Sequence, residues 1–231
     1  MIKTFQLNKC RIILCVQSVK GINKKENQDS YYFGATKRSF VISVCDGLGS
    51  AKKSALGSKK ASELLVNQLL GNRFSKDNFQ VEWLAHFSEN TKDYNTTAKF
   101  VRINGTKITY GGVGDGLIAF KDKKKITSLT NRGDFSNQTS CIFDLDYFNS
   151  FIERERKTLN RMAILISTDG FSEDIKEDGL SVFLDEVYKS FSNKNILKEF
   201  DNSLASLLNN WPNQTNGDDK TVAFLLVERK I

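Results

Sequence analysis

The stretch FVISVCDGLGSAKKSALG, residues 40–57, contains the pattern that decides the fold. An apolar run from Phe40 to Cys45 is typical of a buried strand, and it ends at the pair Asp46-Gly47. Asp and Gly favour a tight turn, because Asp bonds to nearby backbone and Gly tolerates a positive φ. After the turn, apolar residues recur every three or four positions and predict a helix over Ala55–Leu70. The stretch therefore predicts a strand, an acidic turn, and a helix that packs on the sheet.

Acidic turns at strand ends recur along the chain. YGGVGDGLIAF (110–120) places Asp115 between two apolar runs, and MAILISTDGF (162–171) places Asp169 at the end of another. NGDDKTVAFLLV (216–227) places Asp218 and Asp219 just before a last strand. Each of these turns alone is explained by turn chemistry. Together they indicate a set of carboxylates that gather at one sheet edge.

The size and composition are those of an ordinary globular protein. The chain has 231 residues, of which 39% are hydrophobic and 26% charged, enough to form a sizeable core. No apolar run approaches the roughly 18 residues that span a bilayer. The short apolar segment Ile12–Val16 lacks a small-residue cleavage site, so it predicts a strand and not a signal peptide. We expect one domain over residues 1–231, in the cytoplasm and without membrane contact.

The charge and the cysteines exclude several classes of site. The net charge is +7, but the basic residues are spread along the chain and interrupted by acids, which predicts solvated faces. We therefore expect no nucleic-acid partner, although a surface that binds polyanions stays open as an alternative. Four cysteines without a C-x-x-C pair, and a single histidine, argue against a zinc site. The cysteines are expected to be small buried hydrophobic residues.

The order of the predicted elements indicates the fold class. Strands cluster, one long helix follows, more strands come next, and then two helices precede a last strand. Because strands and helices do not alternate, an antiparallel α+β domain is favoured over a parallel sheet. The helices are expected at Ala55–Leu70, Phe79–Ser88, Leu180–Ser190 and Lys194–Asn209. The strands are expected at Ile2–Gln6, Arg11–Ser18, Ser30–Gly34, Phe40–Cys45, Ala98–Asn104, Lys107–Gly111, Gly116–Lys121, Cys141–Leu145, Met162–Ser167 and Thr221–Glu228.

Three polar segments are expected to have structural and not catalytic roles. FIERERK (151–157) is charged and helix-like, and we expect it to be a solvated face. GDFSNQTS (133–140), which contains Asp134, predicts a loop. Ser167 and Thr168 are expected to support the strand end before Asp169, not to act as nucleophiles.

Carboxylates on glycine turns are suited to metal chemistry. They bring oxygen ligands together with little steric cover, and Mg²⁺ and Mn²⁺ prefer oxygen ligands. Two such ions about 3.5–4 Å apart clamp a phosphate and lower the pKa of a bound water to near neutral. Clustered carboxylates repel one another unless a cation neutralises them. A metal centre would therefore explain why these carboxylates lie together, which turn formation alone does not explain.

Five ordered blocks carry a resemblance to a known family. They are NQDS (27–30), VCDGLGS (44–50), GGVGDG (111–116), ISTDGFSE (166–173) and GDDKTV (217–222). Their order resembles that of the metal-dependent type 2C serine/threonine protein phosphatases, and most of all the small bacterial branch. The resemblance runs from about Lys20 to Val227. It implies a four-layer αββα sandwich, in which helices flank two antiparallel β-sheets and a metal centre lies at one end.

The resemblance also implies roles for single residues. Asp46 would bridge two Mn²⁺ or Mg²⁺ ions, and Gly47 would offer its carbonyl oxygen to one of them. Asp169 and Asp219 would hold the first ion, which makes Asp46, Asp169 and Asp219 the catalytic set. Asp29 would lie beside the second ion, directly or through a water.

The implied reaction is hydrolysis of phosphoserine and phosphothreonine on proteins, by a metal-bridging hydroxide and without a phosphoenzyme. Asp115 would match the position of a third and weaker ion, so the resemblance implies two ions or three. The implied partner is a phosphorylated protein, such as a Ser/Thr kinase or one of its targets. The protein itself is expected to be a monomer.

Several departures from the family pattern leave an alternative open. Gln28 stands where some members have Glu, and Lys24 stands near the position of a phosphate-binding Arg. Lysine contacts phosphate as a point charge, not through two parallel hydrogen bonds. Asp218 lies next to Asp219, which leaves the choice of ligand between them open. The alternative is a pseudophosphatase, a binding module that keeps the fold but has weak or no catalysis.

Overall fold

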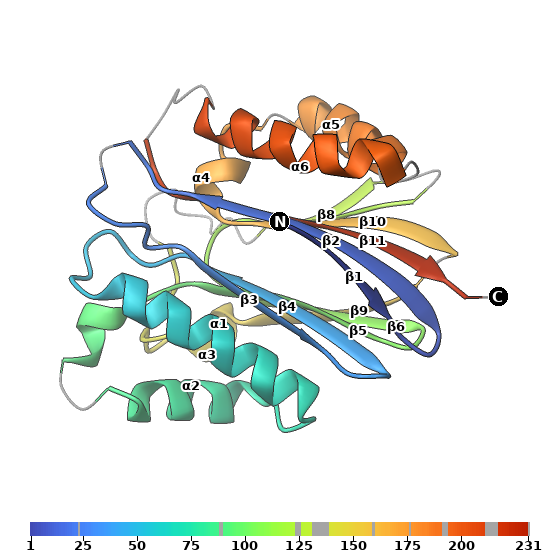
Figure 1. Ribbon diagram of the computed structural model, residues 1–231. Coiled ribbons are helices and arrows are strands. Elements are labelled where there is room, and N and C mark those ends of the chain that lie inside the picture. Colours follow the sequence, from blue (N-terminus) through green and yellow to red (C-terminus); the bar gives the residue numbers. More distant parts are fainter. Residues whose placement is uncertain are drawn as a thin grey trace.

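Two antiparallel β-sheets pack face to face, and helices cover the outer face of each (Figure 1). The computed structural model describes residues 1–22, 24–87, 90–122, 126–130, 139–158, 160–175, 177–190, 194–210 and 217–230. Within these ranges the predicted α+β architecture of four layers is confirmed. No helix in the described part of the chain is both long and apolar enough to cross a membrane.

The first sheet combines both ends of the chain. Its strand order is β1-β2-β11-β10-β7-β8, and every neighbouring pair is antiparallel. The strands are β1 (Ile2–Gln6), β2 (Cys10–Val19), β7 (Leu117–Lys121), β8 (Ile126–Thr130), β10 (Arg161–Ser167) and β11 (Lys220–Arg229). Because β11 lies between β2 and β10, the last strand closes the centre of the sheet.

The second sheet is built from the middle of the chain in the order β3-β4-β5-β6-β9. Its strands are β3 (Ser30–Ala35), β4 (Ser39–Cys45), β5 (Ala98–Asn104), β6 (Lys107–Val113) and β9 (Ile152–Lys157). Gly105, with φ +61°, makes the hairpin turn between β5 and β6 that Asn104-Gly105 predicts.

The helices lie on the outer faces of the two sheets (Figure 1). On the second sheet, α1 (Ser54–Leu70) packs against β3 and β4, and α2 (Lys76–Ala85) packs against α1. On the first sheet, α5 (Glu177–Ser190) packs against β10, and α6 (Lys194–Asn209) packs against β2. Three short helices complete the described chain: η1 (Thr91–Tyr94), α3 (Tyr147–Ser150) and α4 (Asp169–Ser172).

Strand alternation divides the core into layers. On β4, Phe40, Ile42 and Val44 face the other sheet, while Val41 and Cys45 face α1. This explains why the run from Phe40 to Cys45 is almost continuously apolar: both of its faces are buried. All four cysteines are buried and free, as predicted.

Two sequence-based assignments are wrong. FIERERK contains not a helix-like face but β9, an edge strand that pairs only with β6 among the described strands. Edge strands often carry charges, which discourage pairing with other chains, so the charge pattern hid the strand. Cys141–Leu145 is a turn, because the Asp144 carboxylate accepts a hydrogen bond from the Cys141 amide at 2.7 Å. Strand β8 was not expected. Ser88, the last residue of a predicted helix, and Asp134, in a predicted loop, lie outside the described residues.

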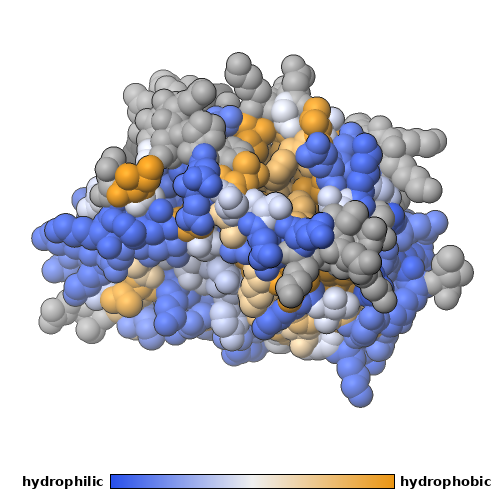
Figure 2. Space-filling view, turned by 45° about the horizontal axis from the view of Figure 1, so that its top comes forward, coloured by the Kyte–Doolittle hydropathy of each residue, from blue (hydrophilic) through white to orange (hydrophobic). Residues whose placement is uncertain are grey.

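Hydrophilic side chains cover much of the face drawn in Figure 2, with smaller apolar areas between them. The pattern agrees with the expectation that the spread charges form solvated faces.

Candidate metal centre

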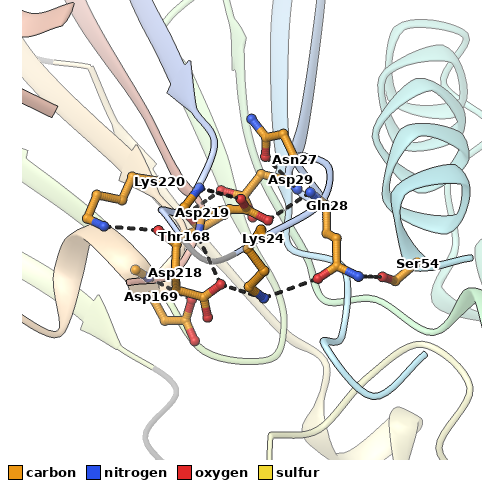
Figure 3. Close-up of polar contacts among 12 residues, drawn as sticks. Lys24, Asn27, Gln28, Asp29, Ser54, Thr168, Asp169, Asp218, Asp219 and Lys220 are labelled. Carbon is orange, nitrogen blue, oxygen red and sulfur yellow. Dashed lines mark hydrogen bonds and ion pairs between the residues drawn. The ribbon is translucent and has the colours of Figure 1, made fainter. Parts of the chain in front are cut away.

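The acidic turns meet because antiparallel pairing places strand ends beside strand starts. Ser30 pairs with Cys45, so Asp29 before β3 lies next to Asp46 after β4. In the other sheet Ser167 pairs with Val222, so Asp169 after β10 lies next to the acids that precede β11. Packing of the two sheets then brings the two pairs together, because the Thr168 hydroxyl from the β10 side donates to Asp29. Figure 3 shows Asp29, Asp169, Asp218 and Asp219 gathered in one place.

The turn at Asp46-Gly47 is fixed by its main chain. The Asp46 amide donates to the Thr97 hydroxyl at 2.9 Å, and the Asp46 carbonyl accepts from the Thr96 hydroxyl at 2.6 Å. At Gly47, a Cβ would lie 2.7 Å from the Gln28 carbonyl oxygen, closer than any side chain can approach. The glycine is therefore required for the β4 turn to pack on the segment that carries Asp29.

Asp29 is buried between the sheets. One of its carboxylate oxygens accepts a hydrogen bond from the Thr168 hydroxyl at 2.9 Å, which links the β3 side to the β10 side. The other oxygen, Oδ1, is buried and has no hydrogen-bond partner among the described residues. Burial raises the pKa of Asp29 to about 7, and hydrogen bonding by Thr168 opposes the rise only in part.

Asp46 and Asp169 form the second part of the cluster. Burial, followed by the negative charges of Asp29 and Asp169, holds the pKa of Asp46 well above its usual range. Burial also raises the pKa of Asp169, which hydrogen bonding to Asp46 offsets only in part, and the charge of Asp218 adds to the rise. Asp46 is therefore close enough to both Asp29 and Asp169 for their charges to raise its pKa.

The two acids before β11 point to different partners. Asp219 is 2% exposed, and its two oxygens accept the backbone amides of Gly21 and Gln28, each at 2.8 Å. Asp218 instead forms an ion pair with Lys24 at 2.7 Å and lies beside Asp169 (Figure 3). Of the two carboxylates, that of Asp218 is thus the one directed toward the Asp46–Asp169 side.

Lys24 and Gln28 form the rim of the cluster. The Lys24 ammonium donates to the Gln28 side-chain oxygen at 3.1 Å as well as to Asp218. The Gln28 amide nitrogen donates to the Ser54 hydroxyl at 2.7 Å, which ties the rim to α1. Burial lowers the pKa of Lys24, but the hydrogen bond and charge of Asp218 outweigh it, so the pKa is raised overall. Lys24 is therefore a cation held at the rim of the cluster, and its binding of phosphate stays a prediction.

Asp115 lies at the edge of the same end. It sits in the turn between β6 and β7 and accepts a hydrogen bond from the Thr139 hydroxyl. Its negative charge is close enough to raise the pKa values of both Asp169 and Lys99. The turn packs closely on the end of β10, because a Cβ on Gly116 would lie 2.5 Å from the Ser167 carbonyl oxygen.

These residues fit a hard divalent cation. Within the described ranges, no three Asp, Glu, His or Cys side chains already enclose a point where an ion would sit. The donor set is nevertheless all oxygen, the Asp29 Oδ1 atom has no described partner, and the pKa values of three neighbouring carboxyls are raised. Burial and mutual repulsion raise those pKa values, and a positive charge between the carboxylates would offset both effects.

The structure also shows supporting residues. Thr168 has the supporting role that the sequence predicts: its hydroxyl donates to Asp29 and accepts the Thr221 amide at 3.0 Å. Ser54 and Thr97 were not singled out, because a hydroxyl in a loop or helix start carries no signal of its own. Lys99 was also missed, although a lysine at an inward position of a predicted strand is a usable signal.

Comparison with known proteins gives a consistent result. A model of the protein phosphatase 2C family matches residues 21–209, a span that contains Asp29, Asp46, Asp115 and Asp169. A curated Mycoplasma genitalium relative named "Putative protein phosphatase" is 37% identical over 59 residues, which is 26% of this chain and 23% of that protein.

Solved structures share the fold at low sequence identity. The serine/threonine phosphatase Stp1 from Staphylococcus aureus matches with a TM-score of 0.68 and 16% identity, over 100% of this chain and 98% of that chain. RsbX in complex with magnesium matches at 0.65 and 15%, over 99% and 100%. The catalytic domain of PstP with two manganese ions matches at 0.61 and 15%, over 96% and 100%. Because the family model covers most of its length, this chain belongs to the protein phosphatase 2C family.

Proposed function

We propose that this protein hydrolyses phosphoserine and phosphothreonine on protein substrates with the help of two Mn²⁺ or Mg²⁺ ions. The observation that carries the proposal is the meeting of Asp29, Asp46 and Asp169 at one end of the sandwich with pKa values raised by burial and mutual repulsion. Raised pKa values in a carboxylate cluster are typical of functional sites. Membership in the protein phosphatase 2C family supports the reaction class.

The positions of the carboxylates suggest how the ions would be held. The charges of both Asp29 and Asp169 act on Asp46, which suits a bridging ligand, and Asp29 would hold the second ion. When bound, the ions would supply an activated water and stabilise the charge of the phosphoryl oxygens. The Gly47 carbonyl would be a further oxygen ligand, offered from the turn that packs closely on Gln28.

For the first ion we propose Asp218 as the partner of Asp169, in place of Asp219. Both oxygens of Asp219 already accept backbone amides, whereas Asp218 faces Asp169 and is partly exposed. Asp219 would then position the segment from Gly21 to Gln28, which carries Lys24 toward the site.

Lys24 is the candidate for binding the substrate phosphate. Its ammonium lies at the rim, and its ion pair with Asp218 keeps it protonated. A phosphate entering the site would share this cation with Asp218 and gain a point-charge contact.

The decisive experiment measures hydrolysis of p-nitrophenyl phosphate and of a phosphothreonine peptide with Mn²⁺, with Mg²⁺ and with EDTA. Wild type should turn over only with metal, and Asp46→Asn should lose that turnover. Asp185→Asn is the matched control, since Asp185 on α5 pairs with Lys121 away from the cluster. Equal turnover with EDTA and with metal would contradict the proposal.

The pseudophosphatase alternative has one observation in its favour. The Gln28 side chain is occupied by Ser54 and Lys24, so a position where some relatives have an acid contributes no charge to the site. A metal-induced rise in melting temperature without turnover would support this alternative. Gln28→Glu would then test whether one added charge restores hydrolysis.

A further inference from the structure

Lys99 is a buried lysine that the proposed chemistry does not use. It is 2% exposed and lies at the start of β5, on the strand face shared with Val101 and Ile103. Val101 and Ile103 belong to the core between the sheets, so the Lys99 side chain also enters the space between the sheets. A buried ammonium is unfavourable unless charge or hydrogen bonds compensate it, so this position needs an explanation.

The Lys99 ammonium ends at the acidic turn between β6 and β7. Its Nζ donates to the Gly114 carbonyl oxygen at 2.6 Å, one residue before Asp115. Its Cε lies 3.3 Å from the position that a Cβ on Gly116 would take. Gly116 has φ +98° and packs on Ser167, so its lack of a side chain leaves space for the lysine. The ammonium is thus enclosed between the turn that carries Asp115 and the strand end before Asp169.

The charges around Lys99 match this placement. Burial lowers the pKa of Lys99 to about 8, and the negative charges of Asp115 and Asp169 oppose the fall. The two acidic neighbours therefore favour the ammonium form of the side chain. Two further lysines lie near Asp218: the Lys24 ammonium pairs with its carboxylate at the partly exposed rim, and the Lys220 ammonium donates to its carbonyl oxygen at 2.9 Å (Figure 3). Lys99 differs from both because it reaches the turn that carries Asp115.

We infer that Lys99 is a positioning residue whose fixed positive charge compensates Asp115 and Asp169 from inside the sandwich, so that the Asp115 corner takes no third ion. The inference rests on the proposed function and names a feature of the same site. A divalent ion at Asp115 would be repelled by the ammonium, and Asp115 already accepts the Thr139 hydroxyl. Lys99 itself does not contact substrate, because it is buried.

The number of bound ions tests the inference independently of activity. Equilibrium dialysis of the metal-free protein against Mn²⁺, up to several millimolar, should give two ions for wild type. Lys99→Gln keeps a donor for the Gly114 carbonyl but removes the charge, so we expect a third ion to bind at least tenfold more tightly than in wild type. The double variant Lys99→Gln/Asp115→Asn should return to two ions.

Two controls separate charge from damage to the fold. Lys99→Arg keeps a cation and should bind two ions, and Lys121→Met removes a lysine at the far end of β7 and should also bind two. Melting curves in EDTA show whether each variant folds. Asp115→Asn alone keeps the test valid if the Lys99 variants do not fold, because it should leave the number of ions at two.

The outcomes distinguish this inference from the proposed function. Three ions in wild type, one of them lost in Asp115→Asn, would overturn the role of Lys99 and leave the two-metal function intact. Two ions in Lys99→Gln would overturn it as well. No bound Mn²⁺ in wild type would overturn the proposed function and this inference together.

Discussion

Asp29 and Asp201 are both carboxylates set among polar groups in this fold, but the folded protein shifts their pKa values in opposite directions. Asp201 on α6 accepts hydrogen bonds from the N-terminal ammonium at 2.5 Å, from Gln17 at 2.8 Å and from the Cys15 thiol at 3.4 Å. Burial alone would raise the pKa of Asp201, but these hydrogen bonds outweigh it and lower the pKa below its usual value. Asp29 has one oxygen without a described partner, and its pKa is raised to about 7.

The difference separates carboxylates that stabilise the fold from those kept for a ligand. At Asp201 the charged form is favoured by the folded state, so it contributes to stability. At Asp29 the charged form is disfavoured by the folded state, so without a cation it costs stability. Natural proteins tolerate such a cost at functional sites. The contrast thus supports the metal centre from energetics, independently of the family comparison.

The largest expected effect separates Asp218 from Asp219. If Asp218 holds an ion, Asp218→Asn should lower metal-dependent turnover on the order of 10³-fold, about 4 kcal/mol of transition-state stabilisation. Asp219→Asn keeps one acceptor for the backbone amides and should lose on the order of tenfold. Steady-state kinetics with Mn²⁺ measures both. The reverse ranking would return the ligand role to Asp219 and leave Asp218 as the partner of Lys24 alone.

The sequence predicts that these carboxylates lie at strand ends, but not which neighbours each of them faces. Asp46, Asp115 and Asp169 each follow or precede an apolar run, so their place at strand ends is a local property. Whether Asp218 or Asp219 faces the cluster depends on the amides of Gly21 and Gln28, which are almost 200 positions away. Local pattern contains no information on such a contact.

The same limit applies to the strands and to Lys99. The central strands were predicted because burial on both faces makes them apolar, whereas β9 at the sheet edge carries charges that resemble a solvated helix. Lys99 alternates with Val101 and Ile103, which indicates an inward position. The charges that make this burial tolerable come from other strands and become visible only in the fold.

The second prediction concerns metal binding to the folded state. An ion that binds only the folded protein at 100 times its Kd stabilises it by about 2.7 kcal/mol. Mn²⁺ should therefore raise the melting temperature of wild type in a concentration-dependent way, measured by differential scanning fluorimetry. In Asp46→Asn the rise should be small or absent, whereas Asp201→Asn should show the full rise. An equal rise in Asp46→Asn would place the ion elsewhere.

The third prediction concerns the effect of Asp29 on the stability of the metal-free protein. Its carboxyl has a pKa of about 7 when folded and about 3.9 when unfolded, so the folded state loses stability as the pH rises from about 4 to 7. In EDTA at pH 7.5, Asp29→Asn should therefore be more stable than wild type, by roughly 2–4 kcal/mol.

Urea unfolding at pH 5 and at pH 7.5 measures this difference. At pH 5 the wild-type carboxyl is mostly protonated in the folded state, so the advantage of Asp29→Asn should shrink. The amide oxygen can still accept the Thr168 hydroxyl, which keeps the local contact in both proteins. A variant less stable than wild type at pH 7.5 would mean that Asp29 serves the fold, as Asp201 does.

The smallest effect is expected at Asp201, with the opposite sign. Asp201→Asn removes a charge that three donors favour and should destabilise the metal-free protein by about 1 kcal/mol at pH 7.5. Because the folded pKa of Asp201 lies below its unfolded value, this contribution is present above about pH 4 and disappears as the pH falls through the folded pKa. Urea unfolding at pH 7.5 and pH 3 follows it, and Mn²⁺ should leave the difference unchanged. If Asp201→Asn and Asp29→Asn shift stability in the same direction, the distinction between the two carboxylates fails, and the raised pKa of Asp29 no longer argues for a ligand.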